Sequence, residues 1–443
     1  MLKTLRRYYW LTQVFIKKHA SIILKSAGII LTILTTIIIF ARYLPTPKET
    51  VKIGRIGKYT LATIPQDIES QIGEGLVTVG KNGEITGALA SSWIVEDDGK
   101  RYTFTLNQKK FWHDGTSVKA EDISYNFTDV EVTRNDNTII YSLKEPFAPF
   151  MQAMTKPILK NDTLGTKEAR ITDYHLVSGN TLQTLTLETN NTRIIYKFYP
   201  TENSALTAYK LGEVNMLDSL STIPQDLATD QSSTIIAQEG DKIAALFINN
   251  SDNLLNSKTT RQGLAYAIPD KSFGKVRALS PISRSSWAYN DLVKDYEYDE
   301  SRAKTLFTQD AKNPSEIKLE LKTMLPYLDV AESIASSWRQ VLGIMVDVKV
   351  VSSVNSDYQI ILADFTPPKD PDQYTLWHST QATNFTKYSN LKVDKLLEDG
   401  RRTLDQKLRE EIYSDFQRFL LEDSPTIFLF ETEKFTLSRK KLF

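Results

Sequence analysis

The stretch Phe111-Trp112-His113-Asp114-Gly115-Thr116, followed six residues later by Asp122, is the most informative part of this sequence. A histidine beside an aspartate suggests acid–base or metal chemistry. The glycine favours a turn, because it adopts backbone conformations that other residues avoid. We therefore expect the histidine and aspartate to bond to local backbone groups and the tryptophan to pack in a core. The segment Val118–Asn126 reads as a short helix with Asp122 facing out.

Three further motifs precede this stretch. They are Gly73-Glu74-Gly75-Leu76, Leu89-Ala90-Ser91-Ser92-Trp93 and Asp97–Leu106, which reads DDGKRYTFTL. One WHDG motif alone would be a weak signal, but four motifs in a fixed order are specific. The order resembles the N-terminal lobe of family 5, the extracytoplasmic substrate-binding proteins of peptide and nickel ABC importers.

The second half of the chain continues this resemblance. Thr259–Lys271 and Tyr298–Phe307 are similar to two helices of the family, and Ile243–Asn250 is similar to the strand that enters the second lobe. The resemblance implies an α/β, two-lobed periplasmic-binding-protein-like fold of class II, with mixed sheets and a hinge of two crossings. The lobes are expected at residues 51–242 with 380–443, and at 243–379. An additional subdomain usual in the family is missing, so the chain resembles a shortened member.

Composition narrows the possible functions. The 443 residues carry 54 basic and 54 acidic side chains, so no overall charge indicates a nucleic-acid partner. The absence of cysteine excludes thiol catalysis, cysteine-ligated zinc and disulfides. It also removes the lipid-bearing cysteine that commonly anchors members of the family.

The N-terminal region offers a different anchor. Ser26–Ala41 contains no charged residue and would span roughly 24 Å as a helix, less than the ~30 Å hydrocarbon core of a bilayer. A helix that begins at Ser21 is long enough to cross the hydrocarbon core, because Lys25 can extend its amine to the membrane interface. We therefore predict a transmembrane anchor over residues 21–43, followed by a linker over 44–50. A cleaved signal peptide is the alternative, although its apolar region is typically shorter and Ala41 is not followed by a small-residue cleavage signal.

The charges beside this segment predict its orientation. Residues 1–25 contain no acid and six basic side chains: Lys3, Arg6, Arg7, Lys17, Lys18 and Lys25. The positive-inside rule therefore places the basic N-terminus, residues 1–20, in the cytoplasm and the large C-terminal domain outside. The sequence predicts a single-pass protein of the cell membrane.

Catalytic motifs are missing from the sequence. The four histidines are far apart, and neither HExxH nor G-x-S-x-G occurs. We expect no enzyme activity, no metal site and no cofactor. Scarce histidine also disfavours nickel as the solute, unless it is carried as a chelate.

The segment Ala363–His378, ADFTPPKDPDQYTLWH, is similar to the interlobe loop that lines the cleft in the family. A peptide ligand needs a carboxylate for its ammonium group, and Asp364 lies where the resemblance implies one, with Asp370 or Asp372 as alternatives. Trp377 is a candidate wall for a side-chain pocket. Weaker candidates in the first lobe are Glu74 and Gly75. The alternative for the whole segment is a solvated turn.

The resemblance implies a substrate-binding component that closes on a peptide, or another small solute, and delivers it to a permease. The permease and ATPase would be separate chains. One alternative is a degenerate binding domain that serves as a cell-surface scaffold or sensor, which the missing subdomain favours. Another is an extracytoplasmic hydrolase, although no catalytic constellation supports it.

Overall fold

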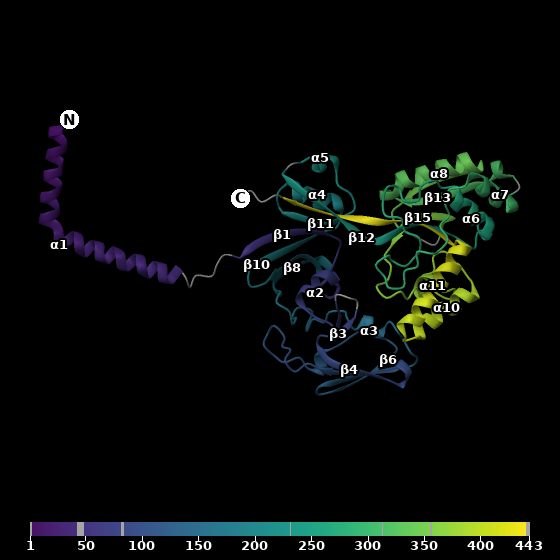
Figure 1. The fold of residues 1–443 in the computed structure, drawn as a ribbon, viewed down its shortest axis with the longest axis horizontal. Helices are drawn as coiled ribbons and strands as arrows, with labels where there is room; N and C mark the ends of the chain where they lie inside the picture. Colours follow the sequence, from purple (N-terminus) through teal and green to yellow (C-terminus); the bar gives the residue numbers. More distant parts are fainter. Residues whose placement is uncertain are drawn as a thin grey trace. The chain divides into compact units, whose positions relative to one another are not determined.

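The computed structural model describes residues 2–41, 48–80, 84–230, 232–311, 313–354 and 357–439. The chain divides into two compact units, Met1–Glu49 and Thr50–Phe443. The first unit contains one long helix, and the second contains the sheets and all other helices of the described residues (Figure 1).

Helix α1 (Leu2–Ala41) is continuous through the basic N-terminal segment and the predicted anchor. Its part Tyr9–Thr36 contains an 18-residue stretch with a mean hydropathy of 1.5, so the helix is long and apolar enough to cross a membrane. Thr32 and Thr35 donate their hydroxyls to carbonyl oxygens one turn earlier, at 3.1 and 2.9 Å, which satisfies these polar groups within the helix. Residues 42–43 of the predicted anchor and 44–47 of the predicted linker lie outside the described residues.

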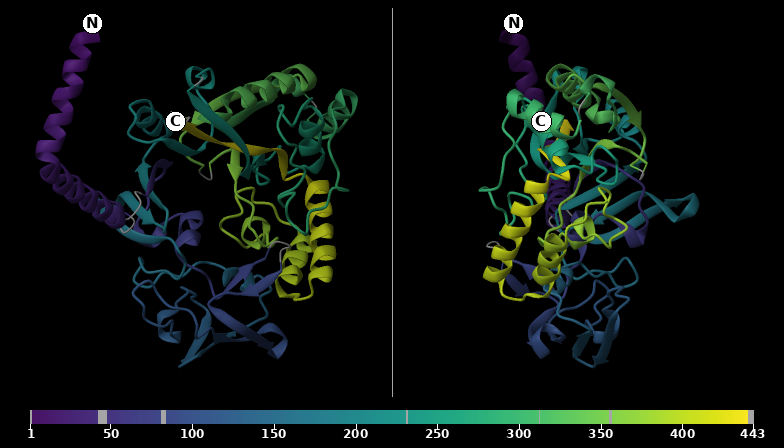
Figure 2. Two further views of the ribbon diagram at one scale, coloured as in Figure 1. Left: turned by 60° about the vertical axis from the view of Figure 1, so that its left-hand side comes forward. Right: turned by 90° about the vertical axis from the view of Figure 1, so that its right-hand side faces the viewer.

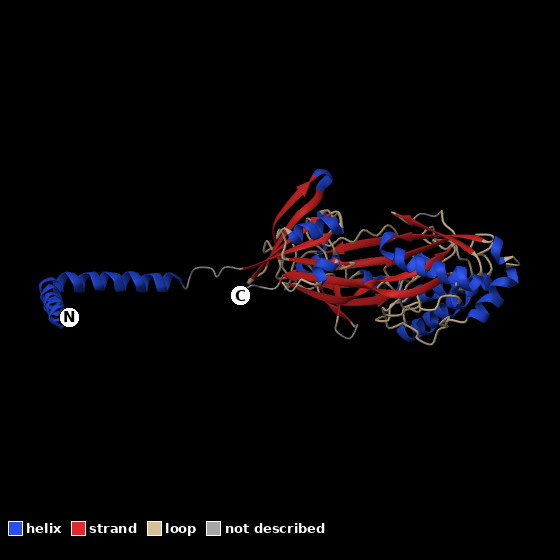
Figure 3. Cartoon of the chain, turned by 90° about the horizontal axis from the view of Figure 1, so that it is seen from above, coloured by secondary structure: helices blue, strands red, loops and turns tan. Residues whose placement is uncertain are grey.

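A ten-stranded mixed sheet is the framework of the second unit. Its order is β14-β13-β15-β12-β16-β11-β1-β10-β9-β8. The strands are β1 (Glu49–Ile56), β8 (Arg170–Val177), β9 (Thr181–Glu188), β10 (Thr192–Tyr199), β11 (Met216–Leu220), β12 (Ser233–Ile248), β13 (Lys318–Met324), β14 (Met345–Val351), β15 (Ile360–Phe365) and β16 (Thr426–Arg439). Figure 3 shows these strands along the length of the unit, with the longer helices gathered at one end.

The two longest strands, β12 and β16, pair antiparallel and pass from one lobe into the other. Ile235 and Phe435 pack with a hydrophobic cluster built from residues 205–227, whereas Ile243 and Phe428 belong to clusters built from residues 243–430. We use these groups to define the first lobe (residues 50–239 and 432–439) and the second lobe (residues 243–430). The fold is therefore two-lobed with two crossings, as predicted.

The crossing has an irregular register. Glu239 pairs with Glu433 and Ile243 pairs with Glu431, so three residues of β12 face one residue of β16. A Cβ atom on Gly240 would lie 2.3 Å from the carbonyl oxygen of Thr432, so the two backbones approach too closely for a side chain. Such an irregularity interrupts the hydrogen-bonded ladder where the lobes meet.

The remainder of the first lobe includes a four-stranded sheet, β4-β5-β7-β6, covered by aromatic side chains such as Tyr102, Phe104, Tyr141 and Phe150. Its elements are η1 (Leu61–Thr63), α2 (Gln66–Ile72), β2 (Val77–Val79), β3 (Ile85–Gly87), β4 (Ala90–Glu96), η2 (Asp97–Gly99), β5 (Arg101–Leu106), η3 (Ala120–Asp122), β6 (Val130–Asn135), β7 (Thr138–Leu143), α3 (Phe150–Ala153), η4 (Ser178–Asn180), α4 (Glu202–Lys210) and α5 (Gln225–Ala228).

The FWHDGT stretch forms the expected turn. Asp114 accepts the Thr116 amide at 2.9 Å, and His113 Nδ1 accepts the amide of Gly165 at 3.2 Å. Trp112 is buried, and its indole donates to Asp122 Oδ2 at 2.9 Å. The expected helix over Val118–Asn126 is only the 3-10 turn η3, and Asp122 is drawn inward by this bond instead of facing out.

The second lobe contains the longer helices of this unit together with several short helical turns. They are α6 (Lys258–Tyr266), α7 (Glu300–Asp310), η5 (Pro314–Glu316), η6 (Leu325–Tyr327), α8 (Leu328–Leu342), α9 (Tyr374–Trp377), α10 (Leu391–Arg402) and α11 (Gln406–Asp423). Helices α10 and α11 lie side by side (Figure 2). Leu397 and Phe416 of this pair share a hydrophobic cluster with Ile243, Ala278 and Trp377.

This cluster corrects the predicted lobe boundary at residues 379 and 380. Residues 380–423 were expected in the first lobe, but α10 and α11 pack against residues 243–377. The return to the first lobe is made by β16, about fifty residues later in the chain than the sequence predicted.

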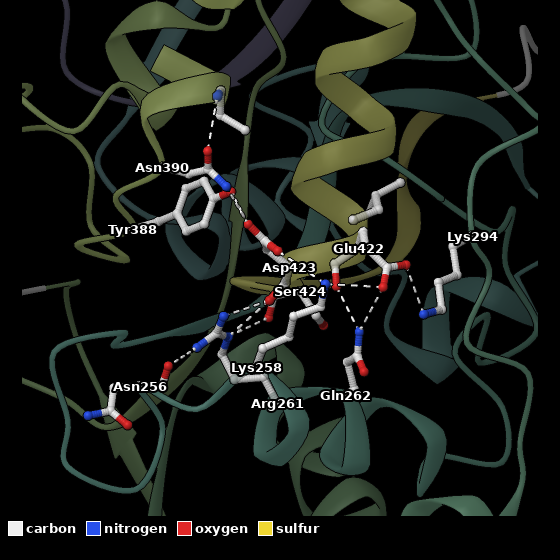
Figure 4. Close-up of polar contacts among 12 residues, drawn as sticks. Asn256, Lys258, Arg261, Gln262, Lys294, Tyr388, Asn390, Glu422, Asp423 and Ser424 are labelled. Atoms are coloured by element: carbon white, nitrogen blue, oxygen red, sulfur yellow. Dashed lines mark hydrogen bonds and ion pairs between the residues drawn. The ribbon is translucent and has the colours of Figure 1, made fainter. Parts of the chain in front are cut away.

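A polar cluster joins α6 to the start of β16 (Figure 4). The buried guanidinium of Arg261 donates to the carbonyl oxygens of Asn256 at 2.8 Å and Asp423 at 2.7 Å. The Asp423 carboxylate accepts the Tyr388 hydroxyl and the Asn390 amide, both at 2.7 Å. These bonds satisfy the carbonyl groups at the C-terminal end of α11 and fix the point where the returning strand begins.

Candidate functional site

A large cavity lies between the lobes. It has a volume of about 870 Å³ and is lined by first-lobe residues within 61–69, 124–127 and 147–162, together with Lys369 and Asp370 of the second lobe. Lys369 Nζ donates to Gln66 Oε1 at 3.4 Å, which connects the two sides. We call this space the interlobe cavity.

Asp370, a predicted ligand carboxylate, lines the interlobe cavity but is already paired. Arg409 of α11 binds its two oxygens, with Nη2–Oδ1 at 2.6 Å and Nη1–Oδ2 at 3.1 Å. The Asp372 amide donates to Asp370 Oδ1 at 3.0 Å. A bidentate pair with a buried arginine fixes the carboxylate in position and uses the oxygens that a ligand would need.

Asp372 is fixed in the same way. Its Oδ2 accepts Nε and Nη2 of Arg401 at 3.0 and 2.7 Å, and its Oδ1 accepts the Tyr374 amide at 3.1 Å. The same guanidinium lies 4.0 Å from the centre of the Tyr374 ring and 5.3 Å from that of Phe147 in the first lobe. Both aspartates therefore attach the loop after β15 to α10 and α11.

Asp364 and Trp377 come together at a second, smaller cavity of about 80 Å³ in the second lobe, lined mainly by apolar side chains that include Phe247 and Phe365. Trp377 is 2% exposed and packs on Phe428, and its indole donates to the Gln373 side chain.

The Asp364 carboxylate has two partners, Lys242 Nζ at 3.0 Å and the Tyr327 hydroxyl at 2.6 Å. Burial and the adjacent Asp364 carboxylate raise the pKa of Tyr327, so this phenol stays protonated and donates. Lys242 belongs to β12, directly after the irregular crossing, so Asp364 connects β15 to the hinge.

Glu74 and Gly75 line neither of these cavities. Glu74 pairs with Lys110 and accepts the Thr166 hydroxyl at 3.3 Å. A Cβ atom on Gly75 would lie 2.3 Å from the carbonyl oxygen of Met154. In this structure both residues hold neighbouring loops together.

Glu69 of α2 also lines the interlobe cavity, and it was not among the site residues predicted from the sequence. Its residue is 8% exposed, and its carboxylate has no hydrogen bond or ion pair with any described residue. Burial raises its pKa; Lys156 opposes this shift and Asp162 adds to it. The available signal was weak, since Glu69 only stands beside the buried pair Ile68 and Ile72 of a short helix.

The sequence matches the family of bacterial extracellular solute-binding proteins, family 5, over residues 84–139 and 130–387. The chain belongs to this family. The matched residues include the FWHDGT turn, the second-lobe helices α6 to α9 and the loop after β15.

Two relatives of this family 5 protein come from Escherichia coli. DdpA, named as a probable D,D-dipeptide-binding periplasmic protein, is 23% identical over 79% of each chain. The dipeptide-binding protein is 24% identical over 81% of this chain and 83% of the relative. The solved structure of NikZ from Campylobacter jejuni in complex with Ni(L-His) has a TM-score of 0.74 at 22% identity, and covers 89% of this chain and 95% of NikZ.

As a family 5 protein, the chain is a solute-binding component of ABC-type import, and its relatives are binding proteins, not enzymes. Among the described residues, no three histidine, cysteine, aspartate or glutamate side chains come together as metal ligands. The candidate site is therefore a cavity between two lobes, lined by apolar side chains such as Ile64, Phe127 and Leu159 together with polar and charged ones.

Proposed function

We propose that this family 5 protein binds a short peptide in the interlobe cavity and delivers it to an ABC permease. The observation that carries the proposal is this cavity of about 870 Å³, lined by both lobes, in a chain whose relatives include a dipeptide-binding protein. Its volume falls within the range typical of small-ligand sites.

Closure of the lobes on the peptide is part of the proposal. The irregular pairing of β12 and β16 at Gly240 gives a position at which the sheet bends between the lobes. A peptide that contacts both lobes stabilises the closed form, which the permease then recognises. The permease and ATPase are separate chains.

The smaller cavity beside Asp364 and Trp377 is proposed to take an apolar side chain of the peptide. Its apolar walls suit a small side chain, and Asp364 is positioned by Lys242 and Tyr327 at the edge. We therefore expect Asp364→Ala to weaken peptide binding. An unchanged affinity in that variant would remove Asp364 from the site.

The N-terminal helix is proposed to remain as a single-pass anchor, with its basic end in the cytoplasm. The uncharged stretch Ser26–Ala41 at the end of α1 and the six basic residues among the first 25 support this topology. The mass of the mature chain, extracted from membranes, tests it. A chain that begins after residue 41 would show a cleaved signal instead.

Native mass spectrometry of the full chain, purified gently in mild detergent, tests the peptide ligand. We expect a set of short-peptide adducts that mild denaturation removes. A clean ligand-free mass, unchanged after incubation with a mixed peptide pool, would contradict the proposal and would favour a scaffold or sensor.

A further inference from the structure

Glu69 is a buried acid without a partner. Glu69 is 8% exposed, yet none of the described residues forms a hydrogen bond or an ion pair with its carboxylate. Its oxygens are not among the fully enclosed side-chain atoms, and partial removal from water disfavours the ionised form. Because Glu69 lines the interlobe cavity, a ligand in that cavity can supply the missing partner.

The other charged groups of the cavity do not replace such a partner. They are Lys156, Asp162, Lys369 and Asp370. Asp370 is paired with Arg409, and Lys369 donates to Gln66. Lys156 is exposed to solvent and interacts with Glu69 only through a charge effect that Asp162 opposes. Glu69 is thus the one buried and unpaired charged group among the described residues that line the cavity.

We propose that Glu69 binds the terminal ammonium group of the peptide, the role that the sequence had assigned to Asp364, Asp370 or Asp372. This inference rests on the proposed peptide function. Those three aspartates have protein partners, whereas no residue in the described part of the chain bonds to the Glu69 carboxylate. The ammonium group donates to the carboxylate inside a partly water-excluded cavity, where a charge-assisted hydrogen bond is strong.

The ammonium group also determines the ionisation of Glu69. Burial raises the pKa of the empty site, and a bound cation lowers it again, so peptide binding releases a proton where the free carboxyl is protonated. The affinity for a peptide with a free amine therefore falls as the pH is lowered through this raised pKa. The other titratable groups that line the cavity are Lys156, Lys369, Asp162 and Asp370, so the slope due to Glu69 is the difference between the wild type and Glu69→Gln.

The test uses the full chain in detergent and two pools of peptides, about two to five residues long, with uncharged side chains. One pool has free amines and the other is N-acetylated. Affinities are measured by titration calorimetry for the wild type, Glu69→Gln and the control Glu121→Gln. Glu121 is an exposed acid of the same lobe that does not line the cavity.

We expect the wild type and Glu121→Gln to bind the free-amine pool about tenfold or more tightly than the acetylated pool. Glu69→Gln should lose that preference and bind both pools with similar, weaker affinity. The acetylated pool tests the inference on unaltered protein, so it does not depend on the folding of a variant.

The outcomes separate the two proposals. Equal binding of both pools by the wild type, or an unchanged preference in Glu69→Gln, would overturn the role of Glu69 and leave the peptide function standing. Binding of neither pool by the wild type would overturn the peptide function and this inference together.

Discussion

Glu69 and Asp370 are carboxylates that line the interlobe cavity from opposite lobes, and they differ in their partners. Asp370 is held by both nitrogens of the Arg409 fork, and the neighbouring Asp372 amide also donates to it. Glu69 is buried without such a partner among the described residues. A paired carboxylate stabilises the fold, and an unpaired one weakens the empty protein but is available to a ligand.

The pairing of Asp370 with Arg409 should give the largest effect. Asp370→Asn leaves a buried guanidinium without its counter-ion, because the side chain of Arg409 is 7% exposed. We expect the free energy of unfolding to fall by about 3 kcal/mol, measured by urea denaturation.

The double variant Asp370→Asn/Arg409→Met is the control for this prediction. It removes both charges, so it should recover part of the lost stability. A stability equal to that of the wild type in the single variant would show that the pair is not a structural feature.

The second prediction tests the crossing between the two lobes that carry Glu69 and Asp370. Gly240→Ala places a methyl group against the carbonyl oxygen of Thr432, at 2.3 Å in the present backbone. We expect a loss of about 2 kcal/mol in the free energy of unfolding. Ala237→Val, at an exposed position of the same strand, is the control and should have little effect. Equal stability of Gly240→Ala and the wild type would show that the crossing can widen freely.

The third prediction concerns the unpaired carboxylate. Because burial raises the pKa of Glu69 above its value in the unfolded chain, this group binds more protons in the folded state between the two values, and its contribution to stability falls as the pH rises. Glu69→Gln cannot ionise. The ligand-free variant should therefore be more stable at neutral pH, by about 1 kcal/mol.

This gain should disappear below about pH 4, where the glutamate is protonated in both states. Thermal unfolding of both proteins across this pH range measures it. A variant less stable than the wild type at neutral pH would show that Glu69 has a structural partner.

The smallest effect is expected for an exposed ion pair at the rim of the interlobe cavity, where the two lobes meet. Arg402 and Glu145 form an exposed pair across the lobes, with Nη2–Oε2 at 2.7 Å. Water screens such pairs, so Arg402→Ala should change the free energy of unfolding by less than about 0.5 kcal/mol. Chemical denaturation of the single variant measures this change. A loss of several kcal/mol would mean that the rim, and not the crossing strands, holds the lobes together.

Much of the fold could be predicted because local signals agreed with it. The run Asn135-Asp136-Asn137 is typical of a hairpin turn and joins β6 to β7, and Gly212, with its positive φ, follows the end of α4. The return crossing was misplaced because Glu431–Lys434 contains no apolar residue, and apolar residues return only at Phe435 and Leu437. This half of β16 therefore does not resemble the buried strand that precedes it.

The site was harder to predict, because pairing depends on residues that are distant in the sequence. Asp370 and Asp372 have the composition of ligand carboxylates, and nothing near them shows that Arg409 and Arg401 will bind them. Glu69 was missed for the converse reason. Burial without a partner is a property of the folded chain, which the residue pattern of a short helix does not reveal.

Strand β16 has a consequence for the biosynthesis of the protein. It follows every other described strand in the chain, yet it lies between β12 and β11 near the middle of the sheet. A ribosome therefore releases the strand that completes both lobes after it has made the rest of the sheet. Until that strand is made, β12 and β11 have no strand between them, so neither lobe of the nascent chain can complete its part of the sheet.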